Sequence, residues 1–158
     1  MYVICSNRLR IKSLPFEMAT HLLLDRKTRF DDSCFSLEFP SFGFKAALPL
    51  YLEQRSPLQY GLWLIRSNEG TCIGEIVTKR DESNAIEIGY LIFEQFRKKG
   101  YATEAVKMLV DWLKTQKVQN FVAYCDIHNN ASQRVLVKNG FTITDRKKMI
   151  LTFEKGVE

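Results

Sequence analysis

The sequence predicts a mixed α/β fold, in which a central, mostly antiparallel sheet of about six to seven strands carries helices on both faces. Three observations lead to this prediction. Short apolar segments with a period of two recur along the chain, some are followed by segments with helical three- and four-residue spacing, and turn-forming residues separate them. At 158 residues, the chain is expected to form one domain over residues 1–158.

The first expected elements are a strand and a helix. Residues 7–12 alternate apolar and basic side chains, which is typical of a strand with one buried face. Ser13 is expected to cap the following helix, with Pro15 in its first turn and its end near Asp25. The segment therefore predicts a strand that leads directly into a helix.

Residues 26–58 carry the weakest pattern in the chain. Phenylalanines are scattered there among Asp, Ser, Gly and Pro, so that no period is evident. A short helix is expected over residues 45–54, with Pro49 early in it.

Residues 60–66 and 71–78 are expected to form a hairpin, because the segment between them has the composition of a turn. A third strand is expected over residues 85–92. The remaining pattern predicts a strand at 120–125, a helix at 130–138, and two last strands at 141–144 and 148–153. Asn139 and Gly140 mark the expected end of the helix at 130–138.

The most informative stretch joins the strand at 85–92 to a helix. Ile86, Ile88, Tyr90 and Ile92 alternate with other residues, and a helical apolar face begins at Ala102. Between them, three consecutive cations precede a glycine. A helix start attracts anions through its unpaired N–H groups and its dipole, so this junction favours a pyrophosphate site. An ordinary strand–helix connection with solvated cations is the alternative.

Two common phosphate loops are absent: the chain has neither G-x-x-x-x-G-K-S/T nor G-x-G-x-x-G. Residues 97–102, Arg-Lys-Lys-Gly-Tyr-Ala, instead resemble the Q/R-x-x-G-x-G/A motif of the GNAT superfamily of N-acetyltransferases. The flanking residues 87–90 and 102–105, together with Asn129 to Phe141, are similar to the branch that acetylates ribosomal-protein N-termini. The resemblance is detailed over residues 86–141, and it implies the GNAT fold and acetyl-CoA as the acyl donor.

The resemblance also implies which residues contact the cofactor. Backbone N–H groups at the helix start would hold the pyrophosphate, the strand at 90–92 would pair with the pantetheine arm, and a loop asparagine would contact the cofactor. The asparagine could instead only cap its helix, or leave that role to Asn130. The expected cofactor-binding residues are Tyr90, Leu91, Ile92, Arg97, Lys98, Lys99, Gly100, Tyr101, Ala102, Thr103, Asn129 and Ser132.

Two residues are expected to be catalytic. Glu87 is the candidate general base, alone or through a water, since a carboxylate in a partly desolvated cleft has a raised pKa. A solvent-facing carboxylate is the alternative. Much of the superfamily has an acidic tyrosine at the position of Leu136, and its absence leaves Ser132 as the candidate near the sulfur. Tyr101 and Tyr124 are reserve donors, and a backbone N–H at 90–92 is the expected oxyanion partner.

Composition limits the other classes of function. Four cysteines without C-x-x-C spacing and only two histidines predict no metal site. No run of 18 apolar residues and no signal-peptide pattern occur, so no membrane partner and a cytoplasmic location are expected. A net charge of +5 suits an anionic partner. Nucleic acid is disfavoured as that partner, because no recognisable module for it is present.

The sequence thus predicts an N-acetyltransferase that moves an acetyl group from acetyl-CoA to a primary amine by direct attack. The acceptor is a protein N-terminus or a small molecule. According to the resemblance, residues 26–58 either form the substrate side of the cleft or merely cover core. A non-catalytic CoA-binding or regulatory module and a basic nucleic-acid-binding protein are the rivals. Formation of a homodimer is left open.

Overall fold

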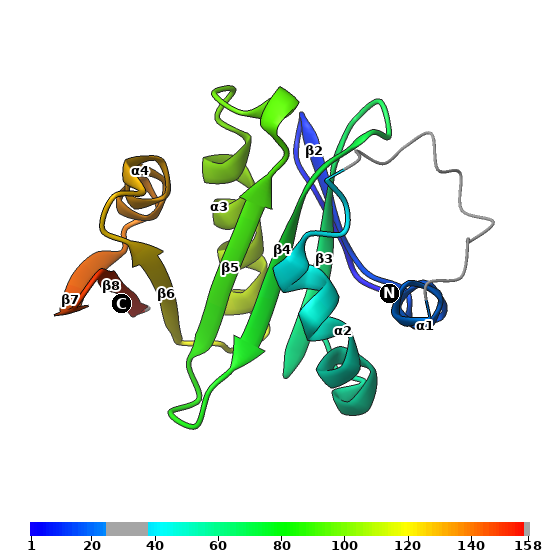
Figure 1. The fold of residues 1–158 in the computed structure, drawn as a ribbon, viewed down its shortest axis with the longest axis horizontal. Helices are drawn as coiled ribbons and strands as arrows, with labels where there is room; N and C mark the ends of the chain where they lie inside the picture. Colours follow the sequence, from blue (N-terminus) through cyan, green and yellow to red (C-terminus); the bar gives the residue numbers. More distant parts are fainter. Residues whose placement is uncertain (25–37, 157–158) are drawn as a thin grey trace.

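A computed structural model describes residues 1–24 and 38–156, and within them the chain forms one open sheet with helices on both sides (Figure 1). The strand order is β1-β2-β3-β4-β5-β6-β8-β7. Every neighbouring pair is antiparallel except β5 and β6, which are parallel. The sheet has eight strands, one more than the predicted upper number, because the short β1 at the N-terminus carries too little pattern to be recognised.

The described elements follow one another in an order that places a crossover helix between the two parallel strands. They are β1 (Val3–Cys5), β2 (Leu9–Ser13), α1 (Phe16–Leu23), α2 (Phe42–Gln54), β3 (Tyr60–Ser67), β4 (Cys72–Arg80), β5 (Ile86–Ile92), the 3₁₀ turn η2 (Glu94–Phe96), α3 (Tyr101–Thr115), β6 (Asn120–Asp126), α4 (Asn130–Lys138), β7 (Thr142–Lys147) and β8 (Ile150–Gly156).

Two apolar cores form on opposite faces of the sheet, because side chains along a strand alternate in direction. In β3, Trp63 and Ile65 belong to the core beneath α3, whereas Leu62 and Leu64 belong to the core beneath α1 and α2. Figure 1 shows α3 behind the sheet and α2 in front of it. Helix α4 contributes Leu136 to the core on the α3 side.

Strands β5 and β6 diverge after a short contact, which is the feature that positions the site. They are paired only at Ile86 with Phe121 and at Glu87 with Val122. On its other edge, β5 remains paired with β4 through to Ile92 without a shift in register. The edge of β5 from residue 88 onward is therefore not paired with β6.

Two local predictions were wrong. Ser13 does not cap α1, because it ends β2 and its hydroxyl accepts a bond from the Tyr2 N–H at 2.8 Å. Helix α2 begins at Phe42, capped by Ser41, so Pro49 lies inside the helix instead of early in it. The cap of α4 was left open between two asparagines, and Asn129 takes that position.

Residues 26–37 of the weakly patterned segment, and with them part of the predicted substrate side, lie outside the described residues. Its described part contains α2, whose Phe44, Leu48 and Tyr51 are buried against the sheet. Among the helices of the described residues, none is long and apolar enough to cross a membrane.

Candidate active site

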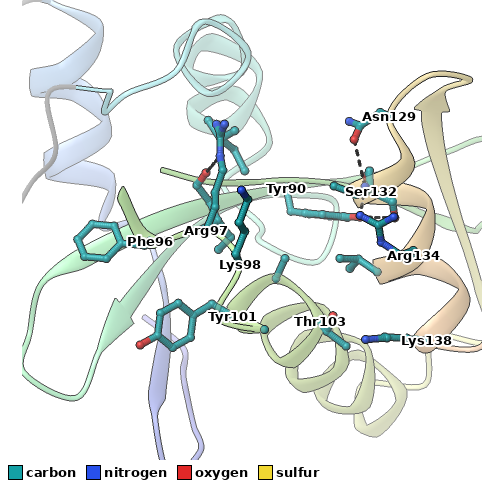
Figure 2. A pocket seen from close by; sticks show the side chains of 16 residues that line it. Tyr90, Phe96, Arg97, Lys98, Tyr101, Thr103, Asn129, Ser132, Arg134 and Lys138 are labelled. Carbon is teal, nitrogen blue, oxygen red and sulfur yellow. Dashed lines mark hydrogen bonds between the residues drawn. The ribbon is translucent and has the colours of Figure 1, made fainter. Parts of the chain in front are cut away.

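A cavity of about 390 Å³ lies where the end of β5, the start of α3 and one face of α4 meet. This volume falls within the range of roughly 300–1,000 Å³ that is usual for small-molecule sites. Figure 2 shows side chains from all three elements around it. The lining residues are Tyr90, Leu91, Ile92, Phe96, Arg97, Lys98, Gly100, Tyr101, Ala102, Thr103, Asn129, Ala131, Ser132, Arg134, Val135 and Lys138.

Most of the predicted cofactor-binding residues lie together in this lining; the exception is Lys99. Its side chain is outside the lining, with its ammonium 5.9 Å from the centre of the Phe96 ring. The prediction grouped three consecutive cations by charge alone. Because consecutive side chains in a turn point in different directions, only two of the three reach the cavity wall.

The loop that enters α3 has an unusual backbone. Lys98 and Gly100 have φ values of 63° and 80°, in the left-handed region that costs a non-glycine residue about 1–2 kcal/mol. Gly100 occupies the N-cap position, and no side chain among the described residues caps this helix start. The N–H groups of the first turn, on the residues that line the cavity, are therefore available to an anion.

Arg97 braces this loop instead of pointing into the cavity. Its Nε donates to the carbonyl oxygen of Ile92 at 2.9 Å, and one of its terminal nitrogens lies 4.0 Å from a carboxylate oxygen of Glu38 (Figure 2 shows the first contact). The Arg97 guanidinium thus connects the end of β5 to the loop that leads into α3.

Sequence reasoning missed two cations on α4. Arg134 and Lys138 both line the cavity, with Lys138 opposite the start of α3 near Thr103 in Figure 2. Their four-residue spacing places them on one helical face. That spacing was a usable signal, but exposed cations at this spacing usually belong to a solvated face. No acidic residue occurs in the described lining, so the cavity is positively charged throughout.

A pair of hydroxyl groups closes the inner end of the cavity. The Tyr90 and Ser132 hydroxyl oxygens are 2.7 Å apart, and the Tyr90 hydroxyl also donates to the Ser132 carbonyl oxygen at 3.1 Å (Figure 2). Burial raises the Tyr90 pKa to about 12, so this phenol stays protonated at neutral pH. The prediction assigned only the backbone of Tyr90 to the site, and alternation along β5 could have identified its side chain.

Asn129 and Cys125 complete the surroundings of Ser132. The Asn129 side-chain oxygen accepts the Ser132 N–H at 3.1 Å, which leaves its NH₂ group to contact a ligand. Cys125 is buried behind Ser132, and burial raises the pKa of its thiol, while its hydrogen bond to Ser132 acts in the opposite direction. This thiol is therefore a poor nucleophile at neutral pH.

Glu87 lies away from this cavity, at the level where β5 and β6 are still paired. The unbroken register of β5 keeps it on the same face as Gly89 and Leu91, opposite the buried Ile86 and Ile88. The carboxylate is half-buried and helps to raise the pKa of Tyr60, for which burial is the larger cause.

The reserve donors differ in position. Tyr101 lines the cavity, whereas Tyr124 is outside its lining and 55% exposed. Leu136 is buried in the core and therefore contributes no proton donor. In the described part of the chain, no group of three or more His, Cys, Asp or Glu side chains could hold a metal ion.

Comparison with known proteins agrees with this geometry. The model of the acetyltransferase (GNAT) domain matches residues 38–142. An uncharacterised N-acetyltransferase, YjdG of Bacillus subtilis (strain 168), is 27% identical over 161 residues, which cover 92% of this chain and 93% of that protein.

Two solved structures have the same fold. Ribosomal-protein-S5-alanine acetyltransferase from Vibrio fischeri superposes with a TM-score of 0.71 at 18% identity, covering 99% of this chain and 97% of that one. RimL, the ribosomal L7/L12 α-N-protein acetyltransferase solved with coenzyme A, gives 0.70 at 17% identity, with 99% and 98% covered. With the family model matched over residues 38–142, the chain belongs to the GNAT acetyltransferase family.

Proposed function

We propose that this protein transfers an acetyl group from acetyl-CoA to a primary amine by direct attack within a ternary complex. The observation that carries the proposal is the cationic cavity, which joins an uncapped helix start to the Tyr90–Ser132 hydroxyl pair. The end at the start of α3 suits phosphate groups, and the end with the hydroxyl pair suits a sulfur atom that must be protonated. One catalytic domain over residues 1–158 and a cytoplasmic location are parts of the same proposal.

The cationic end of the cavity would hold the phosphates of the cofactor. The backbone N–H groups from Gly100 to Thr103 would bind the pyrophosphate, with Lys98, Arg134 and Lys138 providing charge. The unpaired edge of β5 at residues 90–92 would then bond the pantetheine arm as an added strand would. The structure of RimL contains coenzyme A, which supports coenzyme A as the cofactor here. Both solved relatives are named for ribosomal-protein substrates, which supports a protein N-terminus as one class of acceptor.

The inner end of the cavity would carry the chemistry. Acetyl-CoA supplies an activated acyl group whose sulfur leaves as a thiolate. A backbone N–H at residues 90–92 would stabilise the negative charge on the carbonyl oxygen, and the Ser132 hydroxyl would donate a proton to the departing sulfur. The Tyr90 hydroxyl, protonated because its pKa is raised to about 12, would restore the proton on Ser132 or orient it.

Glu87 remains the proposed general base. Acting through water, it would remove a proton from the ammonium of the acceptor, so that the neutral amine can attack. Its place on the face opposite α3 separates it from the cofactor cavity, which suits an acceptor that approaches from the other side of β5. The acceptor itself is a protein N-terminus or a small amine. A non-catalytic CoA-binding module of the same fold is the second candidate, favoured only by the apolar Leu136 where much of the superfamily has an acidic tyrosine.

The test is an acetylation assay that measures release of the CoA thiol. The acceptors would be lysine-free peptides with free Ser or Ala N-termini, the same peptides with blocked N-termini, and small primary amines. We expect turnover with at least one free amine and none with the blocked peptides. Glu87→Gln should lower kcat about 100-fold, as expected for loss of a general base, while the affinity for acetyl-CoA is retained. Glu82→Gln, in an exposed turn, is the matched control.

Binding of acetyl-CoA without turnover of any acceptor would favour the non-catalytic module. Salt-sensitive binding of nucleic acid without binding of CoA would favour the nucleic-acid alternative and contradict the proposal.

A further inference from the structure

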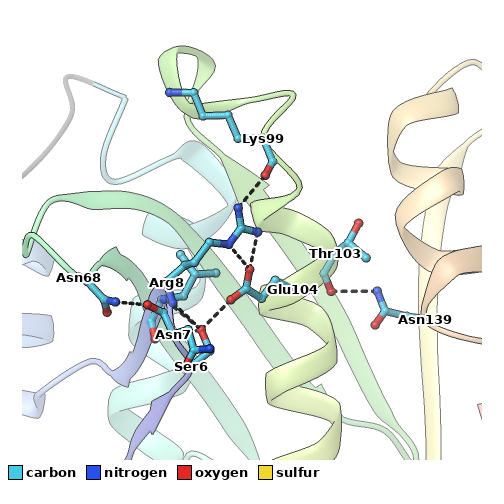
Figure 3. A network of polar contacts seen from close by, with 9 residues as sticks. Ser6, Asn7, Arg8, Asn68, Lys99, Thr103, Glu104 and Asn139 are labelled. Atoms are coloured by element: carbon cyan, nitrogen blue, oxygen red, sulfur yellow. Dashed lines mark hydrogen bonds and ion pairs between the residues drawn. The ribbon is translucent and has the colours of Figure 1, made fainter.

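The turn between β1 and β2 is bonded to the start of α3, although the two segments are far apart in the sequence (Figure 3). The Ser6 hydroxyl donates to one Glu104 oxygen at 2.6 Å, and Arg8 Nε donates to the other at 2.8 Å. A terminal nitrogen of Arg8 contacts that second oxygen too, so the guanidinium engages Glu104 through two nitrogens. The other terminal nitrogen of Arg8 donates to the carbonyl oxygen of Lys99 at 3.2 Å.

The bond to Lys99 has a consequence on the far side of the same peptide. In a planar trans peptide, the C=O of one residue and the N–H of the next point in opposite directions. When Arg8 holds the Lys99 oxygen on its own side, the N–H of Gly100 is directed away from Arg8. Gly100 lines the cavity and Arg8 does not. The contact therefore orients one of the N–H groups that would meet the pyrophosphate.

Arg8 is packed closely against this loop. Its terminal nitrogen lies 3.7 Å from the point where a Cβ on Gly100 would stand. Its guanidinium carbon is 5.0 Å from the centre of the Tyr101 ring, a cation–π distance. Two residues of the predicted phosphate loop thus contact the same side chain. The positive φ of Lys98 is unfavourable for a non-glycine residue, so contacts from outside the loop help to stabilise this conformation.

The negative charge of Glu104 lies in the first turn of α3, close to the predicted phosphate site. A carboxylate in the first turn of a helix stabilises that helix, but it also repels an anion bound at the same end. The Arg8 guanidinium, on the side away from the cavity, cancels the charge of Glu104 without occupying the anion site. Lys98, Arg134 and Lys138 then act on the ligand with no unpaired acidic neighbour in the first turn.

We propose that Arg8, held by Glu104, is a positioning residue that presets the phosphate-binding loop for coenzyme A. The proposal rests on the proposed function, since it assumes that the cofactor pyrophosphate binds at this loop. The Arg8 side chain is 51% exposed, so the ion pair itself should contribute little to folding. Its removal should therefore affect binding of the cofactor more than the stability of the protein.

The experiment compares CoA affinity in wild type, Arg8→Ala and Glu104→Gln. Arg10→Ala, which removes an exposed arginine two residues further along in β2, is the matched control for loss of charge. Arg8→Ala should weaken CoA binding and raise the KM for acetyl-CoA about tenfold, as for loss of charge-assisted hydrogen bonds, with kcat at saturation unchanged. Glu104→Gln should act in the same direction, the double variant should lose less than the sum of the two, and Arg10→Ala should match wild type.

A second ligand separates positioning of the loop from general damage. S-acetylpantetheine has no pyrophosphate, so its use as a slow acyl donor should be equal in wild type and Arg8→Ala. An equal loss with both donors, or CoA affinity in Arg8→Ala like that of wild type, would overturn the inference. Absence of CoA binding in wild type would contradict the proposed function itself, and with it the inference. Should Arg8→Ala fail to fold, Glu104→Gln alone decides by the same comparison.

Discussion

Ser132 stands between two side chains that limit what its hydroxyl group can do. Tyr90 lies 2.7 Å away on the cavity side, and the buried Cys125 thiol lies behind. Both of these neighbours have raised pKa values because of burial, and both therefore remain protonated at neutral pH. Ser132 thus has two protonated neighbours, which is consistent with its proposed role of protonating a thiolate.

This arrangement predicts different effects for two conservative changes. Ser132→Ala should lower kcat about 100-fold, because it removes the group that is proposed to protonate the sulfur. Tyr90→Phe should lower kcat less, because Tyr90 acts through Ser132, and should cost about 1 kcal/mol of folding free energy for the lost hydrogen bond. Steady-state kinetics with acetyl-CoA and denaturant unfolding measure the two quantities. A larger kinetic defect in Tyr90→Phe than in Ser132→Ala would contradict the assigned order.

The free energy of unfolding at alkaline pH tests the environment of Tyr90 separately. Its pKa is raised from 10.0 to about 12 in the folded protein, so folding favours the protonated phenol. The stability that this provides is complete below pH 10 and is lost as the pH rises toward 12. Tyr90→Phe should therefore show a smaller fall in unfolding free energy over that range than wild type, whereas the exposed Tyr124→Phe should follow wild type.

At the scale of elements, helix α2 begins over a buried carboxylate. Glu75 of β4 is 2% exposed, and its oxygen accepts the N–H of Ser41, the N-cap of α2, at 3.3 Å. Burial raises the Glu75 pKa, and the hydrogen bonds from Ser41 only partly oppose that effect. The carboxylate thus orients the helix start at some cost in stability when it is ionised.

Glu75→Gln keeps the shape and the acceptor oxygen but cannot ionise. In wild type the folded pKa lies above 4.5, so the unfolded chain ionises first and stability falls as the pH rises through the interval above 4.5. The variant lacks that fall. Its stability relative to wild type should therefore be higher at pH 7 than at pH 4, as measured by urea unfolding. Glu69→Gln, in the exposed β3–β4 turn, should show no such change.

Local patterns explain which elements could be predicted. The strand β5, the loop after it and helix α3 were recognisable, because a period of two, a glycine and a helical period lie in one continuous stretch. The contacts of Arg8 with Lys99 and Glu104 were not, because no local pattern records a pairing between residues so far apart in the chain. Arg134 and Lys138 were missed because exposed cations on a helix carry no mark of the cavity beside them.

At the scale of the whole molecule, the sheet separates the cofactor cavity from the proposed general base. Helices α3 and α4 lie on the side of the cofactor cavity, with their shared core beneath them. Glu87 faces the side of α1 and α2, where the other core lies. The divergence of β5 and β6 is what connects these sides, since only there does the sheet lack a continuous ladder. An acyl donor and an amine could therefore meet at β5 from opposite directions.

Titration calorimetry of acetyl-CoA binding would be the decisive measurement, performed on wild type, Gly100→Glu and Gly70→Glu. Both glycines have positive φ, but only Gly100 lines the cavity, so Gly70 controls for strain and charge. We predict micromolar binding to wild type and Gly70→Glu, and none to Gly100→Glu, because a side chain is strained at this positive φ and the added carboxylate stands beside Arg8, where it disturbs the loop that would hold the phosphates. Absence of binding to wild type, or equal binding to Gly100→Glu, would contradict a cofactor site at the start of α3.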